Sequence, residues 1–258
     1  MRLMKRILSA AAVLALSASL LVGCSSGTAS SVPVSASSAA ESTVSSVEET
    51  ASSAVDENEA AAAQLLNDLT GSYQELWPVI LADEYKQTWL DDCTALVGEE
   101  NAEAAFEKLS SMVTSDVYGE DAVEAYANGG GAYFCGFTNS LATLTFDGET
   151  STISGTDKDG NVLFSHTYHY IGMEPVHGLY EFESDDADSG EFTYFFLAPD
   201  TSAETYHIEF RYGSDADALS QYDAGDYAYW VASGISTDCD QTMIDNCIEL
   251  FCTENLAG

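Results

Sequence analysis

The chain has 258 residues, and its 43 acidic residues against 7 basic ones give a formal net charge of −36. Such a charge disfavours nucleic acid and anionic lipid surfaces as partners. It is compatible with simple solubility and with the enrichment of cations around the protein, and charge alone does not decide between the two.

The N-terminus has the pattern of a secretory signal. Basic residues within the first six positions precede an apolar run over 7–22, which is too short for a confident membrane span. The run closes with Leu21-Val22-Gly23-Cys24, which resembles a bacterial lipobox. We therefore expect residues 1–23 to be a cleaved signal peptide. Cys24 is then the lipidation site of an extracytoplasmic protein that is lipid-anchored to the cell membrane.

The segment after Cys24 cannot build a core. Residues 25–55 are mostly Ser, Ala, Thr, Val and Glu, with no aromatic residue and no periodic apolar face. Such a composition cannot bury enough surface to offset its ordering entropy. We expect a disordered tether over 24–57 and one folded domain over 58–258.

Three helices are expected first. Residues 57–69 are rich in Ala and Leu and begin with acidic residues, which is typical of a helix. Residues 81–96 and 101–113 are similar, with Asn101 as the expected N-cap of the second.

From Gly131 on, the composition changes to β-branched and aromatic residues separated by turn dipeptides. Asp147-Gly148 joins two short runs as a hairpin, and Asp159-Gly160 makes a second turn. Sequential short strands with tight turns predict an antiparallel meander, either a sandwich or an up-and-down barrel. Further strands are expected over 162–171, 178–183, 191–197 and 205–212, followed by a closing helix over 241–252.

Five cysteines follow Cys24, and none is spaced as a CxxC motif. An exported domain permits disulfides, and the odd number leaves at least one thiol free. Cys135 lies in an expected strand as a small apolar residue. Cys93 could pair with Cys239, Cys247 or Cys252, and the sequence does not choose among them.

Several stretches resemble the ZinT (YodA) family of exported zinc-binding proteins. Residues 71–78 (GSYQELWP) resemble the family's opening motif, and 169–172 (HYIG) and 178–183 (GLYEFE) resemble two of its strands in the same order. Ile235-Ser236 and the closing helix match its last elements. The resemblance implies a mainly β domain with flanking helices, a calycin or lipocalin-like antiparallel up-and-down barrel.

The resemblance also implies a metal site with an altered ligand set. Residues 207–214 (HIEFRYGS) match the family's His-x-His strand and Gly-Ser turn, with His207 kept and Glu209 in place of the second His. Asp200 falls at the third family ligand. Residues i and i+2 of a strand share a face, so we expect His207 and Glu209 to point into the barrel. Two carboxylates and one His suit zinc, and they also suit harder divalent metals.

The expected function is therefore extracytoplasmic binding of a divalent metal, with zinc as the first candidate and a metal ABC-transport system as candidate recipient. The alternative is a metal-free calycin module that binds a small molecule or a partner protein, with His207 as a hydrogen-bonded barrel residue. No Gly-x-Ser-x-Gly elbow and no HExxH motif occur, so we do not expect an enzyme.

Overall fold

The computed structural model describes residues 57–129, 131–199 and 205–257. Within these residues, antiparallel strands follow one another in chain order, and the last pairs with the first to close a barrel. The expected mainly β fold with an up-and-down barrel is confirmed. The strands are β1 (Gly71–Glu75), β2 (Thr143–Asp147), β3 (Thr152–Thr156), β4 (Val162–Met173), β5 (Tyr180–Ser184), β6 (Tyr194–Leu197), β7 (Ile208–Gly213) and β8 (Ala232–Ser236).

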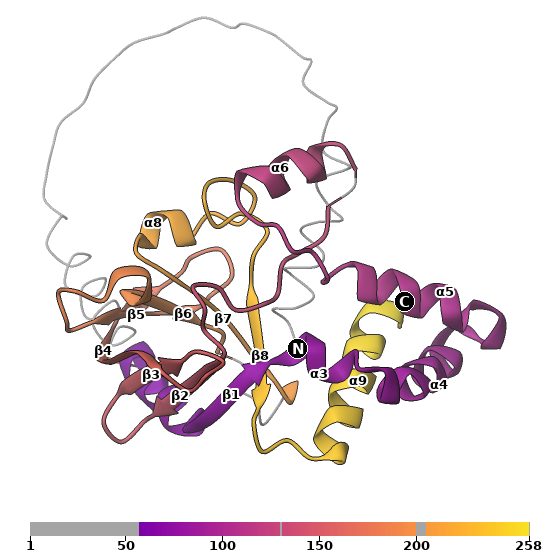
Figure 1. Ribbon diagram of the computed structural model, residues 1–258, viewed down its shortest axis with the longest axis horizontal. Helices are drawn as coiled ribbons and strands as arrows, with labels where there is room; N and C mark the ends of the chain where they lie inside the picture. The colour runs from indigo at the N-terminus through magenta and orange to yellow at the C-terminus, as the bar shows by residue number, and fades with distance from the viewer. Residues whose placement is uncertain (1–56, 130, 200–204, 258) are drawn as a thin grey trace, which may run out of the picture.

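One group of helices lies together at one side of the barrel, and further helices lie elsewhere around it (Figure 1). Residues 57–68 are helical. The long connection between β1 and β2 holds α3 (Leu76–Ile80), η1 (Asp83–Tyr85), α4 (Lys86–Val97), α5 (Glu99–Ser111) and α6 (Glu120–Ala127). The chain ends in α9 (Gln241–Leu256), which packs on α3, α4 and α5. Two short helices lie between strands, η2 (Gly190–Phe192) and α8 (Ala216–Leu219).

The expected start of the helix at 101–113 is wrong. Gly98, with φ +84°, ends α4 and is the N-cap of α5, which begins at Glu99. A left-handed φ is open to glycine at no steric cost, so the chain turns there. Asn101 lies inside α5, and its side-chain amide donates a hydrogen bond to the Val97 carbonyl instead of capping the helix.

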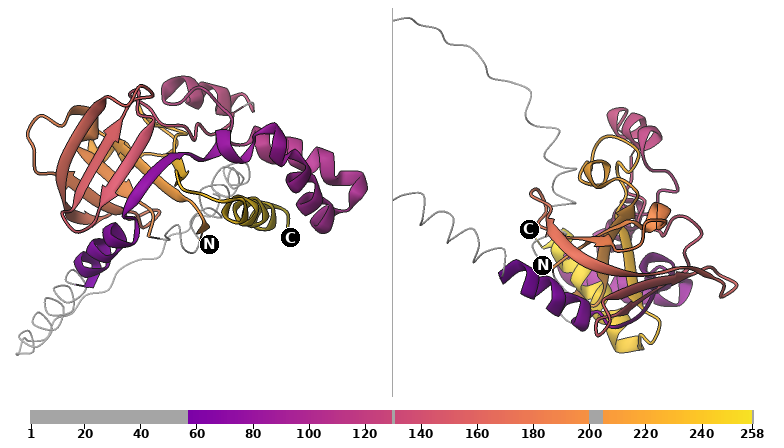
Figure 2. Two further views of the ribbon diagram at one scale, coloured as in Figure 1. Left: turned by 60° about the horizontal axis from the view of Figure 1, so that its bottom comes forward. Right: turned by 90° about the vertical axis from the view of Figure 1, so that its left-hand side faces the viewer.

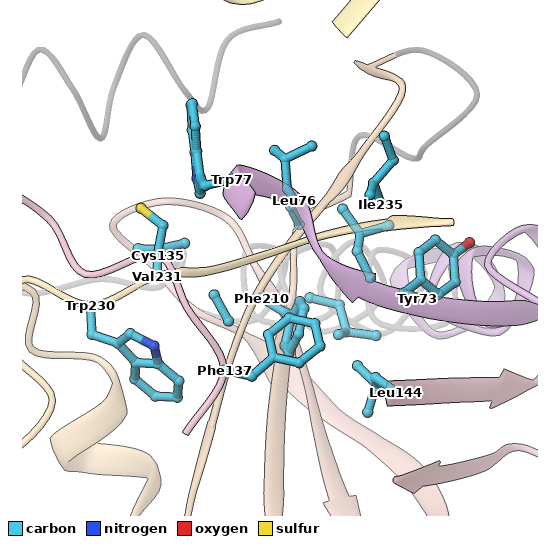
Figure 3. Packing of buried hydrophobic residues seen from close by; sticks show 14 of the residues in the cluster. Tyr73, Leu76, Trp77, Cys135, Phe137, Leu144, Phe210, Trp230, Val231 and Ile235 are labelled. Atoms are coloured by element: carbon cyan, nitrogen blue, oxygen red, sulfur yellow. The ribbon is translucent and has the colours of Figure 1, made fainter. Parts of the chain in front are cut away.

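Aromatic side chains fill the inside of the barrel. The Phe195 ring of β6 lies 5.9 Å from Phe164 and 5.3 Å from Tyr168, both on β4, two strands away. Side chains of non-neighbouring strands meet in this way only across the interior. Phe137 and Phe210 lie against each other in the same core, with ring centroids 5.3 Å apart (Figure 3). The lumen is a packed hydrophobic core.

Several of the sequence-based expectations lie outside the described residues. These are the signal peptide over 1–23, Cys24 and most of the tether over 24–57. No helix in the described part of the chain is long and apolar enough to cross a membrane.

Candidate metal centre on the outer face of the barrel

Strand β7 turns one face inward and one face outward. Phe195, which faces the interior, pairs with Tyr212 in register, so Tyr212 and Phe210 face the interior as well. Glu209 lies between them in sequence and therefore faces outward. The expectation that Glu209 and His207 point into the barrel is wrong, because the apolar side chains of β7 already occupy that face.

His207 lies immediately before β7 and is 4% exposed. Its Nε2 atom lies 3.8 Å from Oε1 of Glu209, so the two predicted ligands are neighbours. Its Nδ1 atom lies 2.6 Å from the Thr205 carbonyl oxygen. A left-handed φ of +63° at Tyr206 turns the chain so that this carbonyl meets the ring two residues later.

The Thr205 carbonyl fixes the tautomer of the neutral imidazole. A carbonyl oxygen can only accept, so Nδ1 carries the proton and Nε2 keeps its lone pair toward Glu209. The Sγ atom of Cys247 in α9 lies 3.9 Å from the same Nδ1 and is the weaker acceptor. The arrangement leaves one imidazole nitrogen and one carboxylate facing each other.

Two opposing effects act on the pKa of His207. Burial lowers it, whereas the contacts with Cys247 and with the Glu209 carboxylate raise it, and the net result is a pKa well above the usual 6.5. A proton is therefore a strong competitor for Nε2.

Helix α9 and a loop before β2 cover the outside of the strand here. Cys247 belongs to α9, and Cys135 is buried beside β8, where its carbonyl accepts a hydrogen bond from the amide of Ser233. Ser233 is the register partner of Glu209. Burial, with the Glu209 carboxylate as a second cause, raises the pKa of the Cys135 thiol. These two thiols escaped the sequence-based site prediction because only the tertiary fold brings them to His207 and Glu209.

The described residues contain no group of three or more His, Cys, Asp or Glu side chains placed to hold a metal ion. Of the three predicted ligands, His207 and Glu209 are the two that lie in this part of the chain, and they lie together. Asp200, the third predicted ligand, lies outside the described residues, as does the lipidation site Cys24.

The other histidines have acidic partners away from this centre. Nδ1 of His166 lies 2.7 Å from Asp186, and Nδ1 of His169 lies 2.7 Å from Asp185. These two histidines therefore have separate acidic partners.

A cleft of about 310 Å³ opens beside the barrel, next to α3. Its wall is mostly apolar, with Glu75 as its charged lining residue. Trp77 and Cys135 line it and lie close together at the outside of the barrel (Figure 3). One oxygen of Glu75 accepts a hydrogen bond of 2.6 Å from the amide of Phe137.

Two solved structures similar to this chain are zinc-bound. The Zn(II)-bound ZinT-like domain of Streptococcus pneumoniae AdcA is 15% identical with a TM-score of 0.46, over 72% of this chain and 89% of that one. Zn(II)-bound AdcA from Streptococcus pneumoniae is 14% identical with a TM-score of 0.42, over 70% of this chain and 34% of that one. No protein-family model and no curated protein matches the chain.

Proposed function

We propose that this chain is a lipid-anchored extracytoplasmic protein that binds a divalent metal, with zinc as the first candidate. In this proposal Nε2 of His207 and the carboxylate of Glu209 are ligands, and Asp200 is a third. The protein is a binding protein, not an enzyme, and it serves as an accessory to a metal ABC-transport system.

The observation that carries the proposal is the fixed tautomer of His207. Metal-binding histidines typically donate their other ring N–H to a carbonyl or carboxylate, which orients the ring and raises its basicity. The Thr205 carbonyl, 2.6 Å from Nδ1, does this here. The free Nε2 then faces an acidic oxygen and not an apolar wall.

The spacing of the two atoms also suits a shared ion. Ligand atoms bound to one tetrahedral zinc at about 2.0–2.1 Å are roughly 3.4 Å apart. Nε2 of His207 and Oε1 of Glu209 are 3.8 Å apart, too far for a hydrogen bond and a few tenths of an ångström from that value. A small side-chain rotation brings both within bonding distance of one ion.

Calorimetric zinc titration at about 0.15 M salt tests this proposal, because that ionic strength screens most weak binding to exposed carboxylates. We expect one site in the parent protein and none in His207→Ala. The matched control is His169→Ala, which removes an exposed histidine paired with Asp185 and should bind as the parent does. Equal binding by the parent and His207→Ala would refute the site.

Replacement of the carboxylate by a second imidazole should act in the opposite direction. Glu209→His restores the two-histidine strand that the resembling family carries. We expect zinc to bind at least about tenfold more tightly, which corresponds to about 1.4 kcal/mol. Weaker binding in this variant would show that Nε2 and residue 209 do not share the ion.

The anchoring part of the proposal rests on the sequence around Cys24. Cys24→Ala should remove the acceptor of the lipid and release the protein from the membrane fraction. Labelling with a fatty-acid analogue measures this directly, and a Cys24→Ala protein that still takes the label would exclude Cys24 as the anchor.

A metal-free binding module is the second candidate, and the cleft beside α3 is the observation that favours it. Its volume of about 310 Å³ and its mostly apolar wall would admit a small molecule. An apolar fluorescent probe should then bind the parent and not Leu81→Trp, whose larger ring fills the cleft. Probe binding without a stoichiometric metal site would favour this candidate over the first.

A further inference from the structure

Two buried thiols face each other where the terminal helix packs on α4. The Sγ atoms of Cys93, in α4, and Cys252, in α9, are 3.9 Å apart. Both side chains are fully buried, at 0% exposure. The two residues are 159 positions apart in the sequence, so the fold alone brings them together.

We propose that Cys93 and Cys252 form a disulfide bond when the protein folds in an oxidising compartment. A bond needs the sulfur atoms at about 2.05 Å, and rotation about the Cα–Cβ bonds can bring them together from 3.9 Å. An extracytoplasmic location, proposed above on the basis of the N-terminal signal, supplies the compartment.

No other pair among the five described thiols lies within hydrogen-bonding distance. Cys247 faces His207 at 3.9 Å, and Cys135 lies against the barrel beside Ser233. Cys247 and Cys252 are on one helix, five positions apart, and point to different neighbours. The geometry therefore selects Cys252 from the three C-terminal cysteines that the sequence leaves open as partners of Cys93.

The reaction requires an external disulfide as oxidant, either a small-molecule disulfide or the disulfide of an exported oxidase. One thiolate of the pair attacks that disulfide, and a mixed disulfide forms as one thiol of the oxidant leaves. The second thiolate then displaces the other half of the oxidant. Two protons and two electrons leave the protein, and the oxidant is reduced to two thiols.

Burial dictates when the bond forms. Burial raises the pKa of both thiols, and no surface path leads an oxidant to side chains with 0% exposure. We therefore expect oxidation before α9 docks on α4, and slow reaction once the helices are packed. The bond then ties the helix that covers His207 to the helical group beside the barrel (Figure 2).

Peptide mapping of the refolded full chain tests the proposal. The reduced, unfolded chain is refolded with oxidised glutathione, free thiols are alkylated, and the digest is analysed by mass spectrometry without reduction. We expect a linked peptide pair that holds Cys93 and Cys252. Already folded, reduced protein in the same buffer should gain the link far more slowly.

Single substitutions give the controls. Cys239→Ser changes a partly exposed thiol and should leave the linked pair intact, whereas Cys93→Ser should abolish it. In urea, the oxidised parent should unfold at a higher midpoint than the reduced parent, and Cys93→Ser should show no such difference. Alkylation of both Cys93 and Cys252 in the refolded parent, or a link from Cys93 to another cysteine, would overturn the proposal.

Discussion

Other parts of the protein cover both faces of β7, yet the two faces carry side chains of opposite chemistry. The inner face carries Ile208, Phe210 and Tyr212, each at most 3% exposed, inside the aromatic core. The outer face carries Glu209 and the fully buried Arg211. Along this single strand, apolar core residues thus alternate with charged residues.

On the outer face, Arg211 is fully buried because separate segments cover it. The guanidinium of Arg211 donates hydrogen bonds to the backbone carbonyls of Leu219, Gln221 and Tyr227, and it stacks 4.1 Å from the Tyr222 ring. A charge without water needs such partners, since an unpaired buried charge costs several kcal/mol. Arg211 thereby holds the segment after β7 against the strand.

The difference between the faces shows where this barrel can bind a ligand. Aromatic rings fill its interior, so within the described residues it has no open cavity of the kind in which a lipocalin-like barrel binds a small molecule. Nε2 of His207 and the carboxylate of Glu209, by contrast, lie outside the barrel, where α9 packs beside His207. A ligand that reaches His207 and Glu209 therefore approaches the wall of the barrel and not its interior.

The largest effect should come from the inner face. Phe195→Ala removes a fully buried ring that contacts several others and should lower the free energy of unfolding by about 3–5 kcal/mol. Urea denaturation measures it, and Val162→Ala, at a residue that is 70% exposed, is the control, with a change within about 0.5 kcal/mol. Zinc binding per folded molecule should be unchanged. A loss of both stability and zinc affinity would mean that the faces are not independent.

A smaller effect on stability should come from Glu174, a fully buried carboxylate in the turn after β4. It accepts hydrogen bonds from the amides of Val176 and His177, at 2.9 and 2.6 Å. Burial raises its pKa, but the hydrogen bonds from His177 and Val176 outweigh burial and leave the pKa below its usual 4.5.

A lowered folded pKa means that the carboxylate stabilises the protein above pH 4.5 and loses this effect as the pH falls through the folded value. Glu174→Gln should therefore unfold about 1–3 kcal/mol more easily at neutral pH, and the difference should shrink in acid. Glu107→Gln, on the exposed side of α5, is the control. A difference that stays constant from neutral pH into acid would contradict this origin.

The β meander could be predicted from the sequence because its signals are local. Asp147-Gly148 lies at the turn between β2 and β3, and the runs around it alternate as a half-buried hairpin does. The orientation of β7 was also encoded, since Ile208, Phe210 and Tyr212 alternate with Glu209 and Arg211. The resemblance to the ZinT family instead predicted that Glu209 points inward. The alternation of apolar residues is the better guide, because it shows which face of the strand packs in the core.

The surroundings of the site could not be predicted. Cys247 meets His207 across 40 positions of sequence, and the Thr205 carbonyl reaches the ring through the left-handed residue Tyr206. Docking of a helix on the outside of a barrel leaves no periodic signal in the strand that it covers. Without that contact, the burial of His207 and the direction of its pKa shift could not be derived.

The pH dependence of zinc binding tests whether His207, on the outer face, is a ligand. Zinc must displace the proton from Nε2, and the raised pKa of His207 means that this competition starts above pH 6.5. Affinity should fall by about tenfold per pH unit below that pKa, since one proton leaves for each ion. Calorimetry at about pH 8, 7 and 6 gives the slope. An affinity that is constant across this range would exclude His207 as a ligand.

The smallest expected effect concerns Cys247, and it decides which nitrogen of His207 binds the metal. Its thiol lies 3.9 Å from Nδ1, the nitrogen whose proton goes to the Thr205 carbonyl at 2.6 Å. If Nε2 is the ligand, Cys247→Ala should change zinc affinity by less than about threefold at a pH above the pKa of His207, because the ion binds on the opposite side of the ring. The substitution should also lower the pKa of His207, since the contact with Cys247 raises it. The pH at which zinc affinity begins to fall should then move downward. Loss of the site in Cys247→Ala, with binding retained in Glu209→Gln, would instead place the metal between Nδ1 and the thiol.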